Sequence, residues 1–137
     1  SMPIAGGENE HSLYGFGELL GAGAVDVVQP DLGSCGGLSA GKHVIALAQA
    51  RGVQINPHVW GSAVAQAASL QFLAAVPVAN HSLFAQEPIL EYDRSSHPFR
   101  SLLVKQPIEQ IGGWVEVPSR PGLGVEVDRS VLEKFQV

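Results

Sequence analysis

The stretch VQINPHVWGSAVAQAASLQFLAAV, residues 53–76, decides the expected fold of this chain. An apolar run ends at Pro57 and His58, and a helix rich in small residues follows over 61–76 and ends at Pro77. A short apolar run followed by a helix is the unit from which parallel sheets with crossover helices are built. The same unit is repeated elsewhere in the chain.

Strand-like runs and helical segments alternate through the first two thirds of the sequence. The expected strand-like runs are residues 2–8, 24–31, 53–58 and 83–92, and the expected helices cover 12–23, 38–52 and 61–76. Apolar residues recur at helical spacing in these helices, and glycines end the first two. The alternation predicts an α/β fold with a parallel sheet.

The end of the chain breaks this rhythm. Residues 112–128 alternate apolar and polar side chains around a Pro/Gly turn, which predicts a two-stranded β-ribbon, and 129–137 suits a terminal helix or an extended tail. We therefore expect residues 1–2 to be a cloning scar on a chain that starts within a fold, 3–111 to form about four βα units, and 112–137 to form a ribbon and tail.

Composition excludes several classes of function. The chain has 137 residues and a formal net charge of −5, and only 15% of its residues are charged. No basic face is expected to bind nucleic acid, and no apolar run approaches a membrane span. Cys35, the single cysteine, excludes an internal disulfide and is expected to be buried as a small hydrophobe. We expect a cytoplasmic protein.

Ionisable residues fall at the ends of the four strand-like runs. Glu8, Asp31, His58 and Glu91 follow one another at steps of 23, 27 and 33 residues, close to the ~31 residues per unit of an eight-unit (β/α) barrel of ~250 residues. All four would emerge at the carboxyl ends of the strands, where such barrels carry their chemistry. Carboxylates beside a histidine suit metal binding and proton transfer.

Taken singly, each of these residues has a plainer explanation. A carboxylate at a strand end is commonly a helix cap or a solvated residue, and a lone histidine is commonly structural. It is their shared position that favours a site. Trp60 could line a pocket or cover the rim of the barrel. The other histidines are expected on the surface or in loops: His11, His43, His81 and His97. The glycine-rich runs lack the spacing of a phosphate-binding loop.

Several ordered motifs resemble one known family. GGEN at 6–9, QPD at 29–31 with CGG at 35–37, PHVWGSA at 57–63, LEYD at 90–93 and PGLGVEVD at 121–128 resemble the carboxyl-terminal half of the catalytic barrel in the mandelate racemase and muconate lactonizing enzyme branch of the enolase superfamily. The resemblance spans nearly the whole chain. It implies the carboxyl-terminal half of a TIM-like (β/α) barrel.

The resemblance also implies roles for particular residues. Glu8 matches a carboxylate ligand of Mg²⁺, His58 the general base, and Asp31 the carboxylate paired with that histidine. Glu91 matches the acid that hydrogen-bonds the substrate carboxylate. Such enzymes remove the α-proton of a carboxylate substrate, here expected to be an acid sugar, and stabilise the enediolate on magnesium; the outcome is racemisation, dehydration or cycloisomerisation.

The remaining parts of such an enzyme have no counterpart in this chain, including two of the metal carboxylates. Because magnesium needs several oxygen ligands, the isolated chain is expected to be inactive and to bind the ion weakly. Two hypotheses stand: a piece of a magnesium-dependent acid-sugar enzyme, or a non-catalytic half-barrel that binds a partner. Four strands cannot close a barrel, so open sheet edges predict a homo-oligomer.

Overall fold

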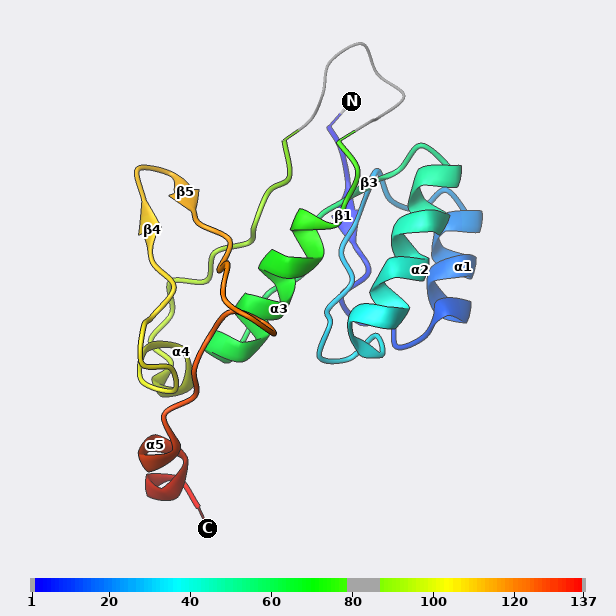
Figure 1. Ribbon diagram of the computed structural model, residues 1–137. Coiled ribbons are helices and arrows are strands. Elements are labelled where there is room, and N and C mark those ends of the chain that lie inside the picture. Colours follow the sequence, from blue (N-terminus) through cyan, green and yellow to red (C-terminus); the bar gives the residue numbers. More distant parts are fainter. Residues whose placement is uncertain (1, 79–86, 137) are drawn as a thin grey trace.

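The structure, a computed structural model, describes residues 2–78 and 87–136. Helices and short strands alternate over the first half, and a hairpin and two short helices follow (Figure 1). In chain order they are β1 (Ala5–Gly6), α1 (Leu13–Gly21), β2 (Val27–Val28), α2 (Gly37–Ala50), β3 (Gln54–Ile55), α3 (Ala63–Ala74), α4 (Pro98–Ser101), β4 (Gln110–Ile111), β5 (Trp114–Val115) and α5 (Arg129–Lys134).

The first three strands form one parallel sheet in the order β1-β2-β3. Ala5 pairs with Val27, and Val27 pairs with Gln54, so the strands run in register from one βα unit to the next. The predicted α/β fold with a parallel sheet is confirmed for these three units. Consecutive parallel strands place their carboxyl ends at the same edge of the sheet.

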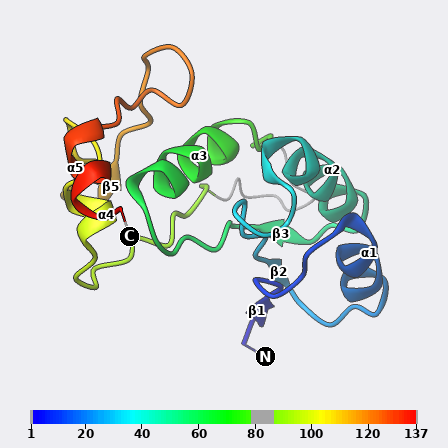
Figure 2. The ribbon, with the colours of Figure 1, turned by 90° about the horizontal axis from the view of Figure 1, so that it is seen from below.

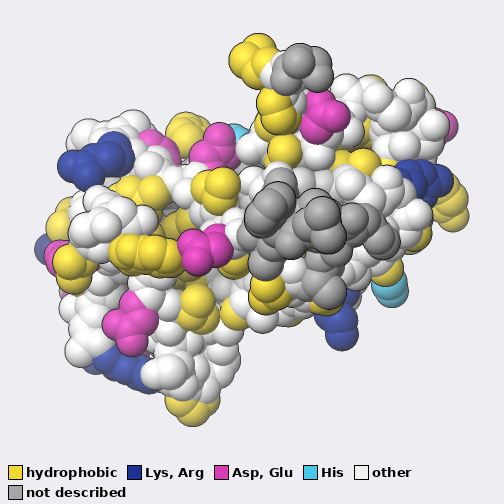
Figure 3. Space-filling view, turned by 90° about the horizontal axis from the view of Figure 1, so that it is seen from above, with side chains coloured by type: hydrophobic (Ala, Val, Ile, Leu, Met, Phe, Trp, Pro, Cys, Tyr) yellow, Lys and Arg dark blue, Asp and Glu magenta, His cyan; other side chains and the backbone are white. Residues whose placement is uncertain are grey.

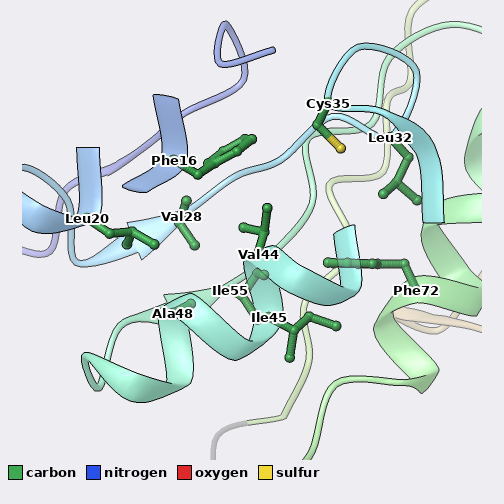
Figure 4. Close-up of a cluster of buried hydrophobic side chains, with 10 residues drawn as sticks. All are labelled: Phe16, Leu20, Val28, Leu32, Cys35, Val44, Ile45, Ala48, Ile55 and Phe72. Carbon is green, nitrogen blue, oxygen red and sulfur yellow. The ribbon is translucent and has the colours of Figure 1, made fainter. Parts of the chain in front are cut away.

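Helices α1, α2 and α3 form an arc along one side of the strands (Figure 2). The apolar cluster between these helices and the sheet is drawn in Figure 4. Its buried members are Phe16, Leu20, Val28, Leu32, Cys35, Val44, Ile45, Ala48, Ile55 and Phe72. Val28 and Ile55 come from adjacent strands and face this cluster, so the helices cover the sheet at β2 and β3.

Local sequence explains where the helices begin and how closely they pack. Ser62 starts α3 as its N-cap, because its hydroxyl accepts a hydrogen bond from the backbone N–H of Ala65 at 3.2 Å. Gly41 in α2 has no side chain where α3 approaches: a Cβ there would lie 2.8 Å from a ring carbon of Phe72. The small residue therefore allows the aromatic ring of α3 to pack directly on α2.

The fourth expected strand is not a strand where the structure describes it. Residues 83–86 lie outside the described part of the chain, and residues 87–92 have no strand pairing. Pro88 lacks a backbone donor, and the backbone N–H of Ile89 donates to the side-chain oxygen of Asn56 at 3.4 Å. This segment therefore contacts the residue that follows β3 through a side chain instead of extending the sheet.

A two-stranded ribbon is present, but it spans residues 110–115 and does not surround the Pro/Gly segment, as was expected for 112–128. β4 pairs with β5 in an antiparallel hairpin, and the turn is made by Gly112 and Gly113, which both have positive φ. The Pro/Gly segment at 118–122 forms no hairpin turn, because its prolines lack ladder donors. β4 and β5 lie on either side of the boundary expected after residue 111, and that domain division stays a prediction. The terminal helix is confirmed as α5.

Among residues 2–78 and 87–136, no helix is long and apolar enough to cross a membrane.

Candidate active site at the carboxyl ends of the strands

Asp31 and His58 are brought together by the sheet. Each lies three residues beyond the end of its strand, β2 or β3, and the two residues form an isolated parallel bridge. The Nδ1 atom of His58 lies 2.8 Å from Oδ2 of Asp31. The pairing of these two residues that the family resemblance implies is therefore present as a direct hydrogen bond.

A proline precedes each member of the pair. Pro30 and Pro57 are fully buried, and the backbone N–H of His58 donates to the carbonyl of Pro30 at 3.2 Å. Because the proline ring fixes φ, the chain leaves each strand in one direction. The two buried prolines thus hold the backbone that carries Asp31 and His58.

The Asp31 carboxylate is fixed at both oxygens. Its Oδ1 accepts a hydrogen bond from the backbone N–H of Gly33 at 2.7 Å, while Oδ2 faces His58. An ionised carboxylate only accepts hydrogen bonds, so Nδ1 of His58 carries the hydrogen and Nε2 keeps its lone pair. The His58 side chain is 32% exposed, which leaves the ring accessible to a ligand. This arrangement can accept a proton at Nε2 and stabilise the resulting imidazolium.

Glu8 lies two residues beyond β1, at the same edge of the sheet. Its Oε1 accepts a weak hydrogen bond from the side chain of Asn9 at 3.4 Å. Within the described ranges, no three His, Cys, Asp or Glu side chains form a group that could hold a metal ion. A single carboxylate does not satisfy magnesium, which requires near-octahedral oxygen coordination. The residues that the structure describes therefore do not fit a complete magnesium site.

Glu91 has an exposed side chain and is not on a strand. Its segment contacts the residue after β3 through a weak, 3.4 Å hydrogen bond from Ile89 to Asn56. The structure therefore places the segment of Glu91 beside the strand that leads to His58. The role of its carboxylate stays a prediction.

Cys35 is close to this edge but is not a candidate nucleophile. It is buried in the apolar cluster, and burial raises the pKa of its thiol, with a smaller increase from the charge of Asp31. A thiol in this state is poorly ionised and unreactive. Its expected packing role is confirmed.

Sequence reasoning missed an aromatic contact beside the pair. Trp60, two residues after His58, is 63% exposed, and its ring makes an edge contact with the ring of His97 at a centroid distance of 6.0 Å. His97 in turn contacts Phe99, which packs against Phe135 of the C-terminal segment. Trp60 therefore contacts a distant loop. No periodicity joins residues 37 positions apart, so only the tertiary structure reveals this contact.

The three βα units place Asp31 and His58 next to each other at the carboxyl ends of adjacent parallel strands. The chain belongs to the family described as enolase C-terminal domain-like, whose model matches residues 1–131. The resemblance to the mandelate racemase and muconate lactonizing enzyme branch is confirmed by solved structures. One of them, a mandelate racemase/muconate lactonizing enzyme from Jannaschia sp. CCS1, has a TM-score of 0.83 and 29% identity, and covers 100% of this chain and 33% of that chain.

Relatives with more specific names act on acid sugars. A D-galactarolactone cycloisomerase from Agrobacterium fabrum is 46% identical over 99% of this chain and 36% of its own length. A D-galactonate dehydratase from Xanthomonas oryzae pv. oryzae is 31% identical over 98% of this chain and 35% of its own. The crystal structure of the 3,6-anhydro-D-galactonate cycloisomerase from Zobellia galactanivorans is 37% identical, with a TM-score of 0.84, over 98% of this chain and 36% of that chain.

The chain spans about a third of the length of the curated relatives that it matches.

Proposed function

We propose that this chain forms the carboxyl-terminal half of the catalytic barrel of an acid-sugar cycloisomerase or dehydratase, in which His58 removes the α-proton of a carboxylate substrate. The observation that carries the proposal is the 2.8 Å contact between His58 Nδ1 and Asp31 Oδ2 at the carboxyl ends of adjacent parallel strands. The 46% identity to a cycloisomerase favours an acid-sugar substrate.

The chemistry assigned to the chain is proton transfer. The lone pair on Nε2 of His58 accepts the proton from the carbon next to the substrate carboxylate, and the Asp31 carboxylate stabilises the imidazolium through Nδ1. Glu91 is assigned to hydrogen-bond the substrate carboxylate, where negative charge increases as the enediolate forms. The same imidazolium can return the proton or pass it to a neighbouring carbon or oxygen.

Glu8 is assigned as one ligand of a magnesium ion whose other ligands are not among the described residues. Because these residues do not complete a site, no catalytic step is derived from the metal. We infer that activity belongs to a full-length protein that carries the additional carboxylates.

Replacement of His58 tests the proposed function. In the full-length protein that carries this chain, we expect His58→Asn to lower turnover of D-galactarolactone or D-galactonate by ~10²–10⁴-fold, the usual contribution of a general base. The measurement is turnover and deuterium incorporation at the α-carbon in deuterated water.

His43→Asn is the matched control, because His43 is exposed on α2 and should change neither quantity. Unchanged deuterium uptake in the His58 variant would contradict the assignment. A full-length protein with no turnover of any acid sugar would favour the non-catalytic half-barrel instead.

A further inference from the structure

The loop that follows Glu91 is closed by one arginine. Nη1 of Arg100 donates to the backbone carbonyls of Asp93 at 3.1 Å and Ser95 at 2.8 Å, and Nη2 pairs with the Asp93 carboxylate. The backbone N–H of Ser95 also donates to Oδ1 of Asp93 at 2.7 Å. A single guanidinium therefore joins α4 to three acceptors of the segment just after Glu91.

This ion pair is protected from solvent. The side chains of Arg100 and Asp93 are 13% and 17% exposed, whereas those of the pair formed by Lys105 and Glu126 are 56% and 58% exposed. Hydrogen bonds from Ser95, followed by the charge of Arg100, lower the pKa of Asp93, so its carboxylate stays ionised at neutral pH. A sheltered guanidinium with several fixed acceptors holds a loop in one geometry, unlike a solvated surface pair.

The same loop connects the segment of Glu91 to the segment of His58. Asp93 is two residues after Glu91. His97, between Asp93 and Arg100 in sequence, packs its ring against Trp60, which is two residues after His58. The loop thus spans from the segment of the proposed acid to the segment of the proposed base.

A second anchor lies on the outer side of the segment. The hydroxyl of Tyr92 donates to the backbone carbonyl of Ile108 at 3.0 Å. Together with the bond from Ile89 to Asn56, this hydrogen bond holds the residues on both sides of Glu91. Residues 89–93 have no strand pairing, so these side-chain contacts do the positioning that a strand ladder does elsewhere.

We propose that Arg100 is a positioning residue for Glu91: by clamping the loop from Asp93 to His97 against Trp60, it sets the separation between the carboxylate of Glu91 and the imidazole of His58. The inference rests on the proposed function, because it assigns a role to a residue that acts through the proposed acid. Arg100 itself contacts neither of these side chains.

The first test measures the clamp in the 137-residue chain without any catalysis. The chain has two tryptophans, so a Trp114→Phe background leaves Trp60 as the only indole fluorophore. In that background, Arg100→Met should shift the emission of Trp60, because the loop no longer holds His97 against it. Arg94→Met is the control, since Arg94 is exposed in the same loop. Identical spectra for Arg100→Met and its parent would overturn the clamp.

The second test is a double-mutant cycle in the full-length protein. Glu91→Gln should lower kcat by ~10²-fold or more, and Arg100→Met should lower it by ~10–100-fold through misplacement of the acid. If Arg100 acts through Glu91, the double variant should match Glu91→Gln alone to within about twofold, the usual error of additivity. Losses that multiply would overturn the proposal, because Arg100 would then act independently of Glu91.

Two further variants separate folding from positioning. Arg100→Lys keeps the charge but not the fork of donors, so it should fold, lose part of the kcat of the parent and show the same lack of additivity with Glu91→Gln. This variant replaces Arg100→Met in the cycle if the methionine variant does not fold. A His58→Asn variant with full activity would contradict the proposed function. If His58→Asn is inactive but the losses from Arg100→Met and Glu91→Gln multiply in the double variant, only the positioning role of Arg100 is contradicted.

Discussion

The Asp31 carboxylate receives hydrogen bonds on both oxygens, one from the backbone of Gly33 and one from the His58 ring. This arrangement fixes the orientation of the carboxylate before any substrate binds, so the imidazole needs no reorganisation to accept a proton. Position at the strand ends predicted that Asp31 and His58 lie on one face, and the family resemblance implied that they pair. The Asp93 and Arg100 pair was not predicted, because its members are seven residues apart in a segment without periodicity.

At the residue scale, the expected weak binding of Mg²⁺ can be measured directly. The 137-residue chain should bind Mg²⁺ only weakly, because Glu8 is the single expected ligand and Asp31 is occupied by His58. Calorimetric titration with MgCl₂ measures this, and Glu8→Gln should leave the weak signal almost unchanged. A micromolar dissociation constant for Mg²⁺ in the parent chain that is lost in Glu8→Gln would contradict the conclusion that the magnesium site is incomplete.

At the element scale, helices followed the sequence more closely than strands did. Caps and apolar spacing define helices locally, so α1 and α3 fall within the expected ranges and α2 begins one residue before its range. The strands are only two residues long, and strand pairing depends on partners that are distant in sequence. The expected strand at 83–92 illustrates this dependence, because residues 87–92 have apolar character but no pairing partner.

The N-cap of α5 is expected to depend on pH. Asp128 accepts hydrogen bonds from the backbone N–H and hydroxyl of Ser130, and these bonds lower the pKa of the carboxyl below its ordinary value of 3.8. The folded helix therefore binds this proton less tightly than the unfolded chain does. The stabilisation is complete above the ordinary pKa and is lost as pH falls through the lower, folded value.

Amide hydrogen exchange or NMR of residues 130–134 measures this effect locally. The amides of α5 should lose protection as pH falls below about 3.8, whereas Asp128→Asn should remove this pH dependence and keep a cap. An unchanged pH profile in the asparagine variant would show that the carboxylate is not responsible.

At the scale of the whole molecule, the two faces of the parallel sheet differ in burial. Val28 and Ile55 are 0% and 5% exposed, because they face the helices. Val27 and Gln54, which alternate with them, are only partly buried. The face of the sheet away from the helices is therefore less completely covered than the helical face.

Exposed apolar side chains still occur at the sheet edge and elsewhere. Ile4, just before the edge strand β1, is 51% exposed, and Trp114 on the β4–β5 hairpin is 69% exposed. On the face shown in Figure 3, hydrophobic side chains lie beside acidic ones, and Lys and Arg side chains are separated from one another. Leaving a large aliphatic side chain exposed forfeits on the order of 1.5–3 kcal/mol.

We therefore expect the 137-residue chain to form a homodimer through the edge of its sheet. Light scattering after size exclusion at low micromolar concentration measures the mass. Ile4→Glu should shift the protein to monomer, because it places a charge at the β1 edge. Trp114→Ser, on the hairpin, should leave the dimer intact. A parent chain that is monomeric and melts sharply would contradict this expectation.

The sequence by itself determined the βα order, the helices, the buried Cys35 and the placement of Asp31 and His58 at the ends of strand-like runs. These features depend on local spacing and on residues at the ends of apolar runs, which are visible along the chain. Only the tertiary structure decided that 87–92 is held by side chains and that His97 packs on Trp60. These features depend on contacts between residues far apart in sequence, whose free energy no local pattern encodes.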